Sequence, residues 1–350
     1  MNPFLAYSGI QLNGKFISKG ELKSVSPKDE FEGQIINYCQ ELFDGSSEAE
    51  IHTSGSTGKK KTILFQKSSL IQSAEATNSY FGLSAETKAL LSLPIDYVAG
   101  KLMVVRAIVG EYNLITKKPE SNPIKDLDQP IDFAPFTPHQ VQAIIDESSS
   151  YLNTIKTVLL GGSPITKELL DQIQDTDTIF YEGFGMAETL THVGIRKISD
   201  SKESLFQPMN DVILGLDSRG CLIIDRPGIT KGKLVTNDIV TLDSEGFKWI
   251  GRVDNLINSG GIKIIPEEIE KILHSQLTSN FFVAGIPDQN FGEIACLFIE
   301  GEEEIDVERI EFESTYHKPK RIVHVKEFCY THSGKIKRRE TISRALSSVG

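Results

Sequence analysis

Hydrophobic residues in the first half of the chain form short strand-like runs that alternate with longer helical runs. The helical runs are GQIINYCQELF (33–43), KSSLIQSAEATNSYFGL (67–83), YVAGKLMVVRAIVG (97–110), VQAIIDE (141–147) and ITKELLDQI (165–173), and the strand-like runs lie at 51–54, 62–65, 88–94, 112–115, 131–136, 157–162 and 178–185. A hairpin is expected at 9–18. The alternation predicts a parallel or mixed sheet with helices packed on its faces.

The pattern changes after residue 190. Short β-rich segments at 191–198, 211–216, 220–225, 232–236 and 246–252 are separated by Gly, Asp and Asn turns, which predicts a small antiparallel sheet or barrel. Beyond it we expect a hairpin, a helix that begins at Pro266, two strands within 280–301, a helix near 305–314, a strand at 321–325 and a basic C-terminal helix. The predicted fold is therefore a large α/β N-terminal domain, 1–254, with a small antiparallel β subdomain, followed by a small mobile α+β domain, 255–350.

Composition narrows the class of protein. The 350 residues carry a net charge of −11, which argues against a general nucleic-acid or membrane-surface binder. The longest apolar run, LMVVRAIVG at 102–110, is too short to span a bilayer, and the first residues do not resemble a secretory signal. Four cysteines lie far apart without a CxxC pair, so neither a disulfide framework nor a zinc site is expected. We therefore expect a cytoplasmic protein.

Four polar segments carry candidate chemistry. HTSGSTGKKKT (52–62) lies between two strand-like runs, and its backbone N–H groups, hydroxyls and ammonium groups can cradle phosphates. It is not a P-loop, because Thr53 stands where that pattern has its first glycine. YEGFGMAET (181–189) offers an aromatic ring to stack on a purine and a carboxylate for Mg²⁺. Alone, the first is equally well a solvated polar loop, and the second is better interpreted as a turn at a strand end with a solvated glutamate.

The other two segments follow in the second half of the chain. In the segment 235–270, Asp238 can accept hydrogen bonds from two vicinal ribose hydroxyls. Arg252 can donate a fork of hydrogen bonds to ribose or phosphate oxygens. THSGKIKRRE (331–340) places Lys335 in a glycine-containing loop before a basic helix, although surface lysines at a helix start would look the same.

Together and in this order, the segments resemble the adenylate-forming acyl- and aryl-CoA synthetases. Residues 52–61 are similar to that family's [YF]TSG[ST]TGxPK loop, with His52 and Lys60 as departures. The other similar segments are LLGGSPI (159–165), FGMAE (184–188), TND (236–238), GRVD (251–254), SGG with PEEIE (259–270) and SGKIKR (333–338). Ala187 replaces a threonine of the family and Asn237 a glycine. The resemblance covers roughly residues 50–340.

The resemblance implies ATP, Mg²⁺ and coenzyme A, and it assigns roles residue by residue. Lys335 would bridge the attacking carboxylate and the α-phosphate, Glu188 would meet Mg²⁺, and Asp254 would be the hinge about which the small domain turns. The remaining assignments are Thr53, Ser54, Gly55, Ser56, Thr57, Gly58 and Lys61 at the pyrophosphate end of ATP, Gly162, Ser163, Glu182 and Phe184 around adenine, Asp238 and Arg252 at ribose, and Gly260 beside the pantetheine path. Only about fifty residues precede the phosphate loop, fewer than in the family. A shorter N-terminal subdomain could expose a sheet edge or apolar surface, and formation of a homodimer is one way to cover it.

The segment LSLPIDYVAGKLMVVRAIVG (91–110) resembles the family's acyl-pocket sequence, with Tyr97 at a histidine position. With the compact length, it makes the chain most similar to o-succinylbenzoate–CoA ligases of menaquinone synthesis. That substrate has a second carboxylate, for which Lys101 and Arg106 are candidate partners. Other carboxylates stay open, as do a carrier-protein thiol as acceptor, a non-catalytic nucleotide-binding relative, and a kinase or ATPase releasing ADP.

Overall fold

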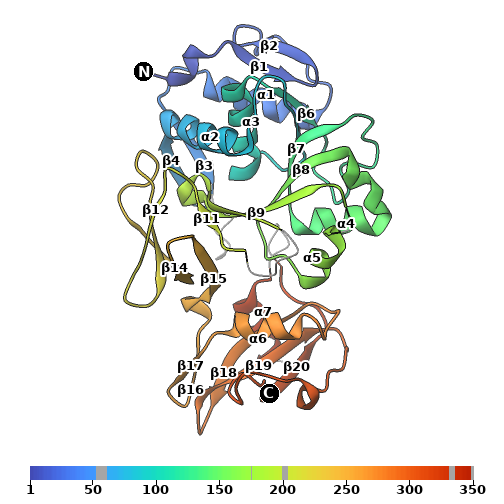
Figure 1. The fold of residues 1–350 in the computed structure, drawn as a ribbon, viewed down its shortest axis with the longest axis vertical. Coiled ribbons are helices and arrows are strands. Elements are labelled where there is room, and N and C mark those ends of the chain that lie inside the picture. The colour runs from blue at the N-terminus through green and yellow to red at the C-terminus, as the bar shows by residue number, and fades with distance from the viewer. Residues whose placement is uncertain (53–60, 175, 199–203, 331–335, 348–350) are drawn as a thin grey trace.

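The computed structural model describes residues 1–52, 61–174, 176–198, 204–330 and 336–347. Its centre is a nine-stranded sheet (Figure 1). In spatial order the strands are β11 (Gln207–Pro208), β10 (Thr191–Lys197), β9 (Ile179–Met186), β8 (Ile155–Leu160), β7 (Ile131–Phe136), β5 (Lys88–Leu91), β6 (Asn113–Thr116), β1 (Gly9–Leu12) and β2 (Lys15–Ser18). The strands from β9 to β1 are parallel, and antiparallel pairs flank them at both edges. The predicted mixed sheet and the hairpin at its edge are confirmed.

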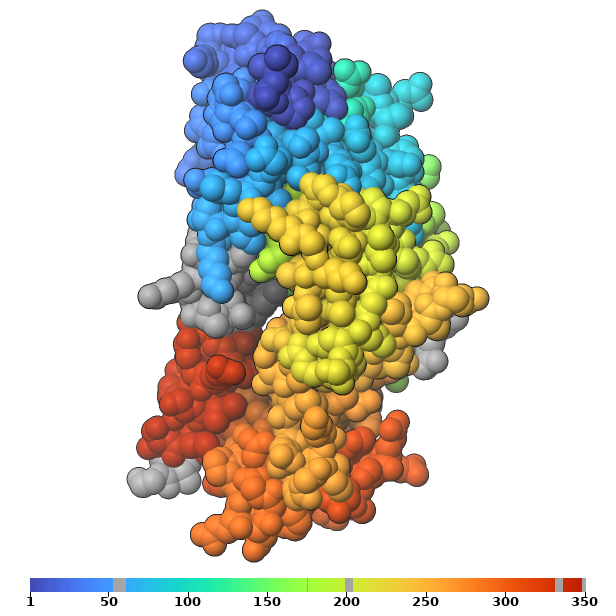
Figure 2. Space-filling model, turned by 90° about the vertical axis from the view of Figure 1, so that its left-hand side faces the viewer, coloured from blue at the N-terminus to red at the C-terminus, as the bar shows by residue number. Residues whose placement is uncertain are grey.

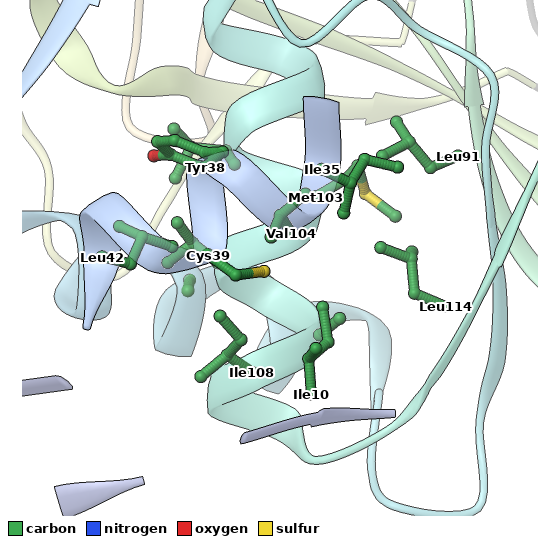
Figure 3. Close-up of a cluster of buried hydrophobic side chains, with 14 of the residues drawn as sticks. Ile10, Ile35, Tyr38, Cys39, Leu42, Leu91, Met103, Val104, Ile108 and Leu114 are labelled. Atoms are coloured by element: carbon green, nitrogen blue, oxygen red, sulfur yellow. The ribbon is translucent and has the colours of Figure 1, made fainter. Parts of the chain in front are cut away.

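Helices cover both faces of this sheet because successive residues of its strands point to opposite sides. Leu91 and Leu114 join a core with the helices α1 (Glu30–Leu42), α2 (Lys67–Phe81) and α3 (Val98–Gly110), and Figure 3 shows their side chains meeting those of α1 and α3. Their neighbours in sequence, Leu90 and Ile115, point to the opposite face and join a second core with α4 (Pro138–Ser148) and α5 (Lys167–Ile173). Short 3₁₀ helices, η1 (Pro3–Ala6) and η2 (Ser149–Thr154), complete this part.

A four-stranded antiparallel sheet follows, with the order β12 (Ile213–Leu216), β13 (Cys221–Asp225), β14 (Leu234–Leu242) and β15 (Phe247–Arg252). It shares a core with β10 through residues such as Val193, Ile195, Leu222 and Phe247. The sequence pattern placed 191–198 in this small sheet, and that was wrong. The segment instead forms β10 of the large sheet, because the three-residue η3 (Ala187–Thr189) turns it back directly onto β9.

The C-terminal part has its own sheet, in which β17 (Ile262–Ile264), β16 (Ile257–Ser259), β19 (Gly292–Glu300) and β18 (Phe281–Asp288) are neighbours and β20 (Arg321–Val325) pairs in parallel with β19. The helix α6 (Pro266–Leu273) packs in one core with one set of alternating sheet residues. The helix α7 (Arg338–Ser347) packs in a second core with the residues between them. In Figure 2 the C-terminal part, orange to red, forms the end of the molecule opposite the blue N-terminal residues. The helix α6 begins at Pro266 as predicted.

The helix expected near 305–314 is absent from this described segment, where only the single turn η5 (Val307–Arg309) forms. The apolar residues Ile305, Val307, Ile310 and Phe312 all pack on the adjacent core. Their spacing of two, three and two residues does not follow one helical face, so packing as an irregular segment buries more of them.

All four cysteines are unpaired, and three of them are buried. Burial raises the pKa of the Cys39 thiol to about 12, so it behaves as a small apolar side chain. The longest described helix, α2, has 15 residues. None of the described helices has the length and apolar character that crossing a membrane requires.

Candidate functional site

The predicted phosphate loop joins the two strands of a separate hairpin, β3 (Glu48–His52) and β4 (Thr62–Gln66). Thr53, Ser54, Gly55, Ser56, Thr57 and Gly58 lie outside the described residues. Lys61 is exposed immediately before β4. Nδ1 of His52 lies 3.1 Å from Oγ1 of Thr62 at the base of the loop. The hairpin therefore ends where the sequence predicted a phosphate loop.

Several predicted residues follow the carboxyl ends of parallel strands, which lie at one edge of the sheet. Tyr97 follows β5, Gly162 and Ser163 follow β8, and Glu188 follows β9. Strand order reverses between β5 and β7, and open α/β sheets bind ligands outside the strand ends at such a reversal. Gly162 and Ser163 are exposed there, and Gly162 has φ +93°. The fold thus brings these candidates together.

Glu188 lies in η3, between the end of β9 and the start of β10, and its side chain is exposed. No described residue forms an ion pair with it. Mg²⁺ is commonly held by one or two carboxylates together with substrate phosphates, so an open carboxylate at this edge fits such an ion. No cluster of three or more metal-binding side chains occurs in the described ranges.

The backbone after Glu188 is strained. Leu190 has φ +50° and Thr191 has φ +88°, a region uncommon for any residue but glycine and rarest for β-branched ones such as Thr191. Such strain persists only where surrounding contacts fix it, and it is concentrated at functional sites. Here Oγ of Ser73 donates to the carbonyl of Leu190 at 2.7 Å, and Oγ1 of Thr189 donates to the carbonyl of Thr191 at 2.7 Å.

Gly185 allows β10 to approach β9 at this turn. A Cβ at Gly185 would lie 2.0 Å from the carbonyl oxygen of Thr191 and 2.4 Å from Cα of His192. We expect Gly185→Ala to destabilise the protein by about 1–3 kcal/mol, the usual cost of overpacking, measured by urea unfolding. Gly45→Ala is the matched control, because its added Cβ meets no atom within 4 Å. Equal stability of the two variants would contradict the close approach.

Two further predicted residues lie earlier on β9. Glu182 forms an ion pair with Arg196 of β10, and Phe184 packs against other aromatic rings. Nη2 and Nε of Arg196 lie 2.5 and 2.6 Å from Oε2 of Glu182, while burial raises the pKa of that carboxyl group. The ring of Phe184 meets those of Phe206 and Phe247 with centroids 5.8 and 5.2 Å apart. The side chains of Glu182 and Phe184, two of the four residues predicted around adenine, are thus held by contacts within the protein.

Asp238 and Arg252 face each other on the paired strands β14 and β15. Only 6% of Asp238 is exposed. Its Oδ1 accepts from Nη1 of Arg252 and from Nε1 of Trp249, each at 3.1 Å. Although burial works against its charge, hydrogen bonding to Asp254 and the charge of Asp238 raise the pKa of Arg252. The predicted ribose pair is therefore preassembled.

Asp254 lies in η4 (Val253–Asn255), which joins the last strand of the small sheet to the first strand of the C-terminal sheet. Its Oδ2 accepts from Nη2 of Arg252 at 2.8 Å. Nδ2 of Asn237 reaches both carboxylate oxygens, at 3.0 and 3.2 Å. Gly260 follows the strand β16 and has φ +61°, and its N–H donates to the backbone carbonyl of Phe291 at 2.7 Å. Asn237, which departs from the family's glycine, thus binds the predicted hinge carboxylate.

The two candidate partners for a second carboxylate, both on α3, differ sharply. Nζ of Lys101 donates to the carbonyl of Glu50 at 2.9 Å and lies 4.8 Å from the ring centre of Tyr38. Arg106 is 2% exposed, and its Nε lacks a hydrogen-bond partner in the described part of the chain. Its other contacts are Nη2 to Oγ1 of Thr191 at 3.0 Å and Nη1 to the sulfur of Met103 at 3.6 Å.

Within the described structure, Nε of Arg106 therefore lacks a partner, whereas Nζ of Lys101 already donates to a carbonyl. Burial lowers the pKa of Arg106 to about 10, so the guanidinium stays charged at neutral pH. A buried guanidinium without an acidic partner is costly in free energy unless a ligand supplies the negative charge. The hydrogen bond from Arg106 to Thr191 places the guanidinium next to the turn that carries Glu188.

Lys335 lies outside the described residues, but both ends of its loop are described. Tyr330 and Ile336 form an antiparallel bridge, and the N–H of Lys337 donates to the carbonyl of Cys329 at 2.7 Å. Glu300 accepts from the hydroxyl of Tyr330 at 2.5 Å and from the N–H of Phe328 at 2.6 Å. The loop is thus closed at its base.

Sequence reasoning did not identify Ser73, Trp249 or Arg226, each of which contacts a candidate residue or its turn. Trp249 lies three residues before Arg252, and a register shift in the pairing of β14 with β15 brings its ring N–H to Asp238. Ser73 and Arg226 contact the turn only through the tertiary fold, and no local motif marks them.

Comparisons with known proteins identify relatives of this chain. The AMP-binding enzyme family matches residues 49–213. The 2-succinylbenzoate–CoA ligase of Listeria monocytogenes is 28% identical over 94% of this chain and 80% of its own length. The acyl-CoA synthetase (AMP-forming)/AMP-acid ligase II-like protein of Dyadobacter fermentans is 32% identical, with a TM-score of 0.64 over 94% of this chain and 99% of that protein.

A further solved structure supports the fold alone. O-succinylbenzoate coenzyme A synthetase (MenE) of Bacillus subtilis, in complex with ATP and magnesium ion, has a TM-score of 0.74 at 20% identity. The alignment covers 85% of this chain and 70% of that protein. The two-part architecture predicted from the sequence is thus shared with solved adenylate-forming enzymes.

Proposed function

Because this chain belongs to the family of AMP-binding enzymes, the adenylate-forming acyl-CoA ligases, we propose that it is an ATP-dependent o-succinylbenzoate–CoA ligase of menaquinone biosynthesis. A 2-succinylbenzoate–CoA ligase is among its relatives over most of both chains. The observation that carries the choice of substrate is the buried guanidinium of Arg106, which lacks an acidic partner in the described structure.

The first half-reaction makes the carboxylate a better electrophile. One carboxylate oxygen attacks the α-phosphorus of ATP, and the bond to the departing pyrophosphate breaks. Such a displacement needs positioning and charge neutralisation more than covalent help. In our proposal the loop 53–58 and Lys61 hold the pyrophosphate end, and Lys335 spans the attacking oxygen and the α-phosphate. Mg²⁺ on the phosphates, held by Glu188, would supply further positive charge.

The nucleoside end would bind across the strand ends and the small sheet. Asp238 and Arg252 hold each other in place at 3.1 Å and would grip the ribose hydroxyls. Phe184, with Gly162 and Ser163, would flank adenine. Both contacts of Glu182 with Arg196 use Oε2, so Oε1 can accept from the adenine amino group.

The second half-reaction transfers the acyl group to a thiol. The sulfur of coenzyme A attacks the acyl carbonyl carbon, and the bond to AMP breaks. We propose that residues 255–350 act as a separate mobile domain and turn about Asp254 between the two steps. This movement would withdraw Lys335 and bring Gly260 beside the pantetheine arm. Lid movements of this kind can gate turnover.

The second carboxylate of the substrate would meet Arg106 rather than Lys101. The ammonium group of Lys101 already binds a carbonyl and faces a ring, whereas none of the described residues accepts a hydrogen bond from Nε of Arg106. Tyr97 begins α3 at the strand end and would line the entrance to the acyl pocket. A dicarboxylate would therefore neutralise a charge that the fold leaves buried.

A panel of carboxylates tests the proposed function. Release of pyrophosphate is measured with and without coenzyme A for o-succinylbenzoate, aryl, fatty and amino acids. We expect AMP and pyrophosphate, with the highest kcat/KM for o-succinylbenzoate. A higher kcat/KM for a monocarboxylate would contradict the substrate, and ADP as product would contradict the reaction class. A carrier-protein phosphopantetheine offered in place of coenzyme A separates the two thiol acceptors.

A further inference from the structure

Arg226 lies on the turn after β13, far in sequence from Glu188, yet it reaches the turn that carries Glu188. Only 1% of its side chain is exposed. Nη1 donates to the carbonyl of Thr189 at 2.9 Å and is 3.4 Å from the carbonyl of His192. The guanidinium thus spans the two strained residues, Leu190 and Thr191, from one side to the other.

The position of Arg226 is itself fixed by several contacts. Its Nε donates to Oδ2 of Asp211 at 2.8 Å. Its backbone N–H donates to Oγ1 of Thr230 at 2.9 Å, and its carbonyl accepts from the N–H groups of Ile229 and Thr230, each at 2.9 Å. A buried guanidinium held in this way is a rigid donor, since its hydrogen-bonding groups are fixed in a plane.

A second set of contacts holds the same turn from α2. Ser73 donates to Leu190 at 2.7 Å, and Oγ1 of Thr77 lies 3.0 Å from Nε2 of His192. Burial, with Arg106 and Arg226 acting in the same direction, holds the pKa of His192 well below its usual value. The imidazole is therefore neutral, and the charge that acts on this turn is that of the two arginines.

These contacts explain how a strained backbone persists at φ +50° and +88°. An unfavourable conformation of this kind needs contacts that leave the chain no relaxed alternative. The three-residue η3 gives Glu188 little independent support, because its cap contact comes from Thr189. Loss of Arg226 would let 189–192 relax, and the carboxylate of Glu188 would move with the backbone.

We propose that Arg226 is a positioning residue for the metal-binding carboxylate of Glu188, acting through the carbonyls of Thr189 and His192. The inference rests on the proposed role of Glu188 toward Mg²⁺. Residues that orient a metal ligand typically change metal affinity by about 10- to 100-fold when they are replaced. We expect a change of that size in Arg226→Gln, although its side chain would not touch the ion.

The test measures Mn²⁺ affinity for the complex of the full chain with ATP by electron paramagnetic resonance, and ATP affinity in EDTA by calorimetry. Glu188→Gln and Arg226→Gln should each weaken Mn²⁺ binding about 10- to 100-fold, with ATP affinity in EDTA unchanged. The double variant should be no weaker than Glu188→Gln alone, because the two residues act through one carboxylate. Lys67→Gln, which removes an equally buried cation paired with Asp44, should leave Mn²⁺ affinity unchanged.

Other outcomes overturn the proposal in distinguishable ways. Normal Mn²⁺ affinity in Arg226→Gln with a loss in Glu188→Gln would refute the positioning role and leave the proposed function standing. Fully additive losses would show that Arg226 acts elsewhere. No loss in Glu188→Gln would refute the role of Glu188 and, with it, that of Arg226. If Arg226→Gln does not fold, Ser73→Ala removes a single bond to the same turn and should lower Mn²⁺ affinity in the same direction.

Discussion

Replacing Lys335 with alanine should abolish adenylation while sparing thioester formation. With o-succinylbenzoate and ATP, we expect pyrophosphate release to fall about 10²- to 10³-fold, the usual effect of removing one group that stabilises developing charge. The reason is that no other residue in the proposed arrangement contacts both the attacking oxygen and the α-phosphate. Single-turnover assays measure this half-reaction without coenzyme A.

The second half-reaction supplies the control for Lys335. When preformed o-succinylbenzoyl-adenylate and coenzyme A are added, Lys335→Ala should form the thioester at a rate close to that of the parent protein. Lys337→Ala is a matched variant, because Lys337 belongs to the same basic segment and pairs with Glu340 at 3.0 Å. It should keep both half-reactions. Equal losses of both steps in Lys335→Ala would contradict a role confined to adenylation.

Replacing Arg106 with methionine should weaken substrate binding and leave the free protein as stable or more stable. A charge-assisted hydrogen bond contributes about 1.5–3 kcal/mol, so KM for o-succinylbenzoate should rise about 10- to 150-fold. Without substrate, the variant removes a buried charge that has no acidic partner in the described structure. Such a replacement by an apolar side chain is often neutral or stabilising. Steady-state kinetics and thermal unfolding measure the two effects.

A substrate lacking the non-reacting carboxylate makes the test of Arg106 specific. The parent protein should strongly prefer o-succinylbenzoate to this analogue, and Arg106→Met should lose the preference. Lys101→Met, on the same helix, should instead lower the melting temperature, because Lys101 binds the carbonyl of Glu50, and should keep the preference. A lower melting temperature for Arg106→Met, with equal losses on both substrates, would show that Arg106 is structural.

Local patterns in the sequence predicted much of the fold. Short apolar runs between helical ones indicated the parallel strands, and turn residues at 217–246 indicated the small antiparallel sheet. The register of β10 was not predictable in this way, since its alternation fits either sheet and the three-residue η3 alone directs it to β9. The segment 305–314 was mistaken for a helix because composition suggested one, although its apolar spacing did not.

The candidate site was indicated by single-residue chemistry at Asp238 and Arg252, which the structure places 3.1 Å apart, and their contact with ribose stays a prediction. It was not predictable where the chemistry depends on tertiary neighbours. Lys101 and Arg106 are both cations on one buried helix, and only the structure shows that Lys101 donates to a carbonyl while Nε of Arg106 has no partner among the described residues. Likewise, nothing local to Arg226 indicates that it lies against Thr189. The domain boundary, the hinge and a homodimer stay predictions.

The most direct test of carboxylate activation is exchange of labelled pyrophosphate into ATP without coenzyme A, because exchange requires reversible formation of an acyl-adenylate. We predict exchange that depends on o-succinylbenzoate and is lost in Lys335→Ala. If the parent protein consumes ATP with o-succinylbenzoate but shows no exchange, and yields ADP in place of AMP, the account is wrong.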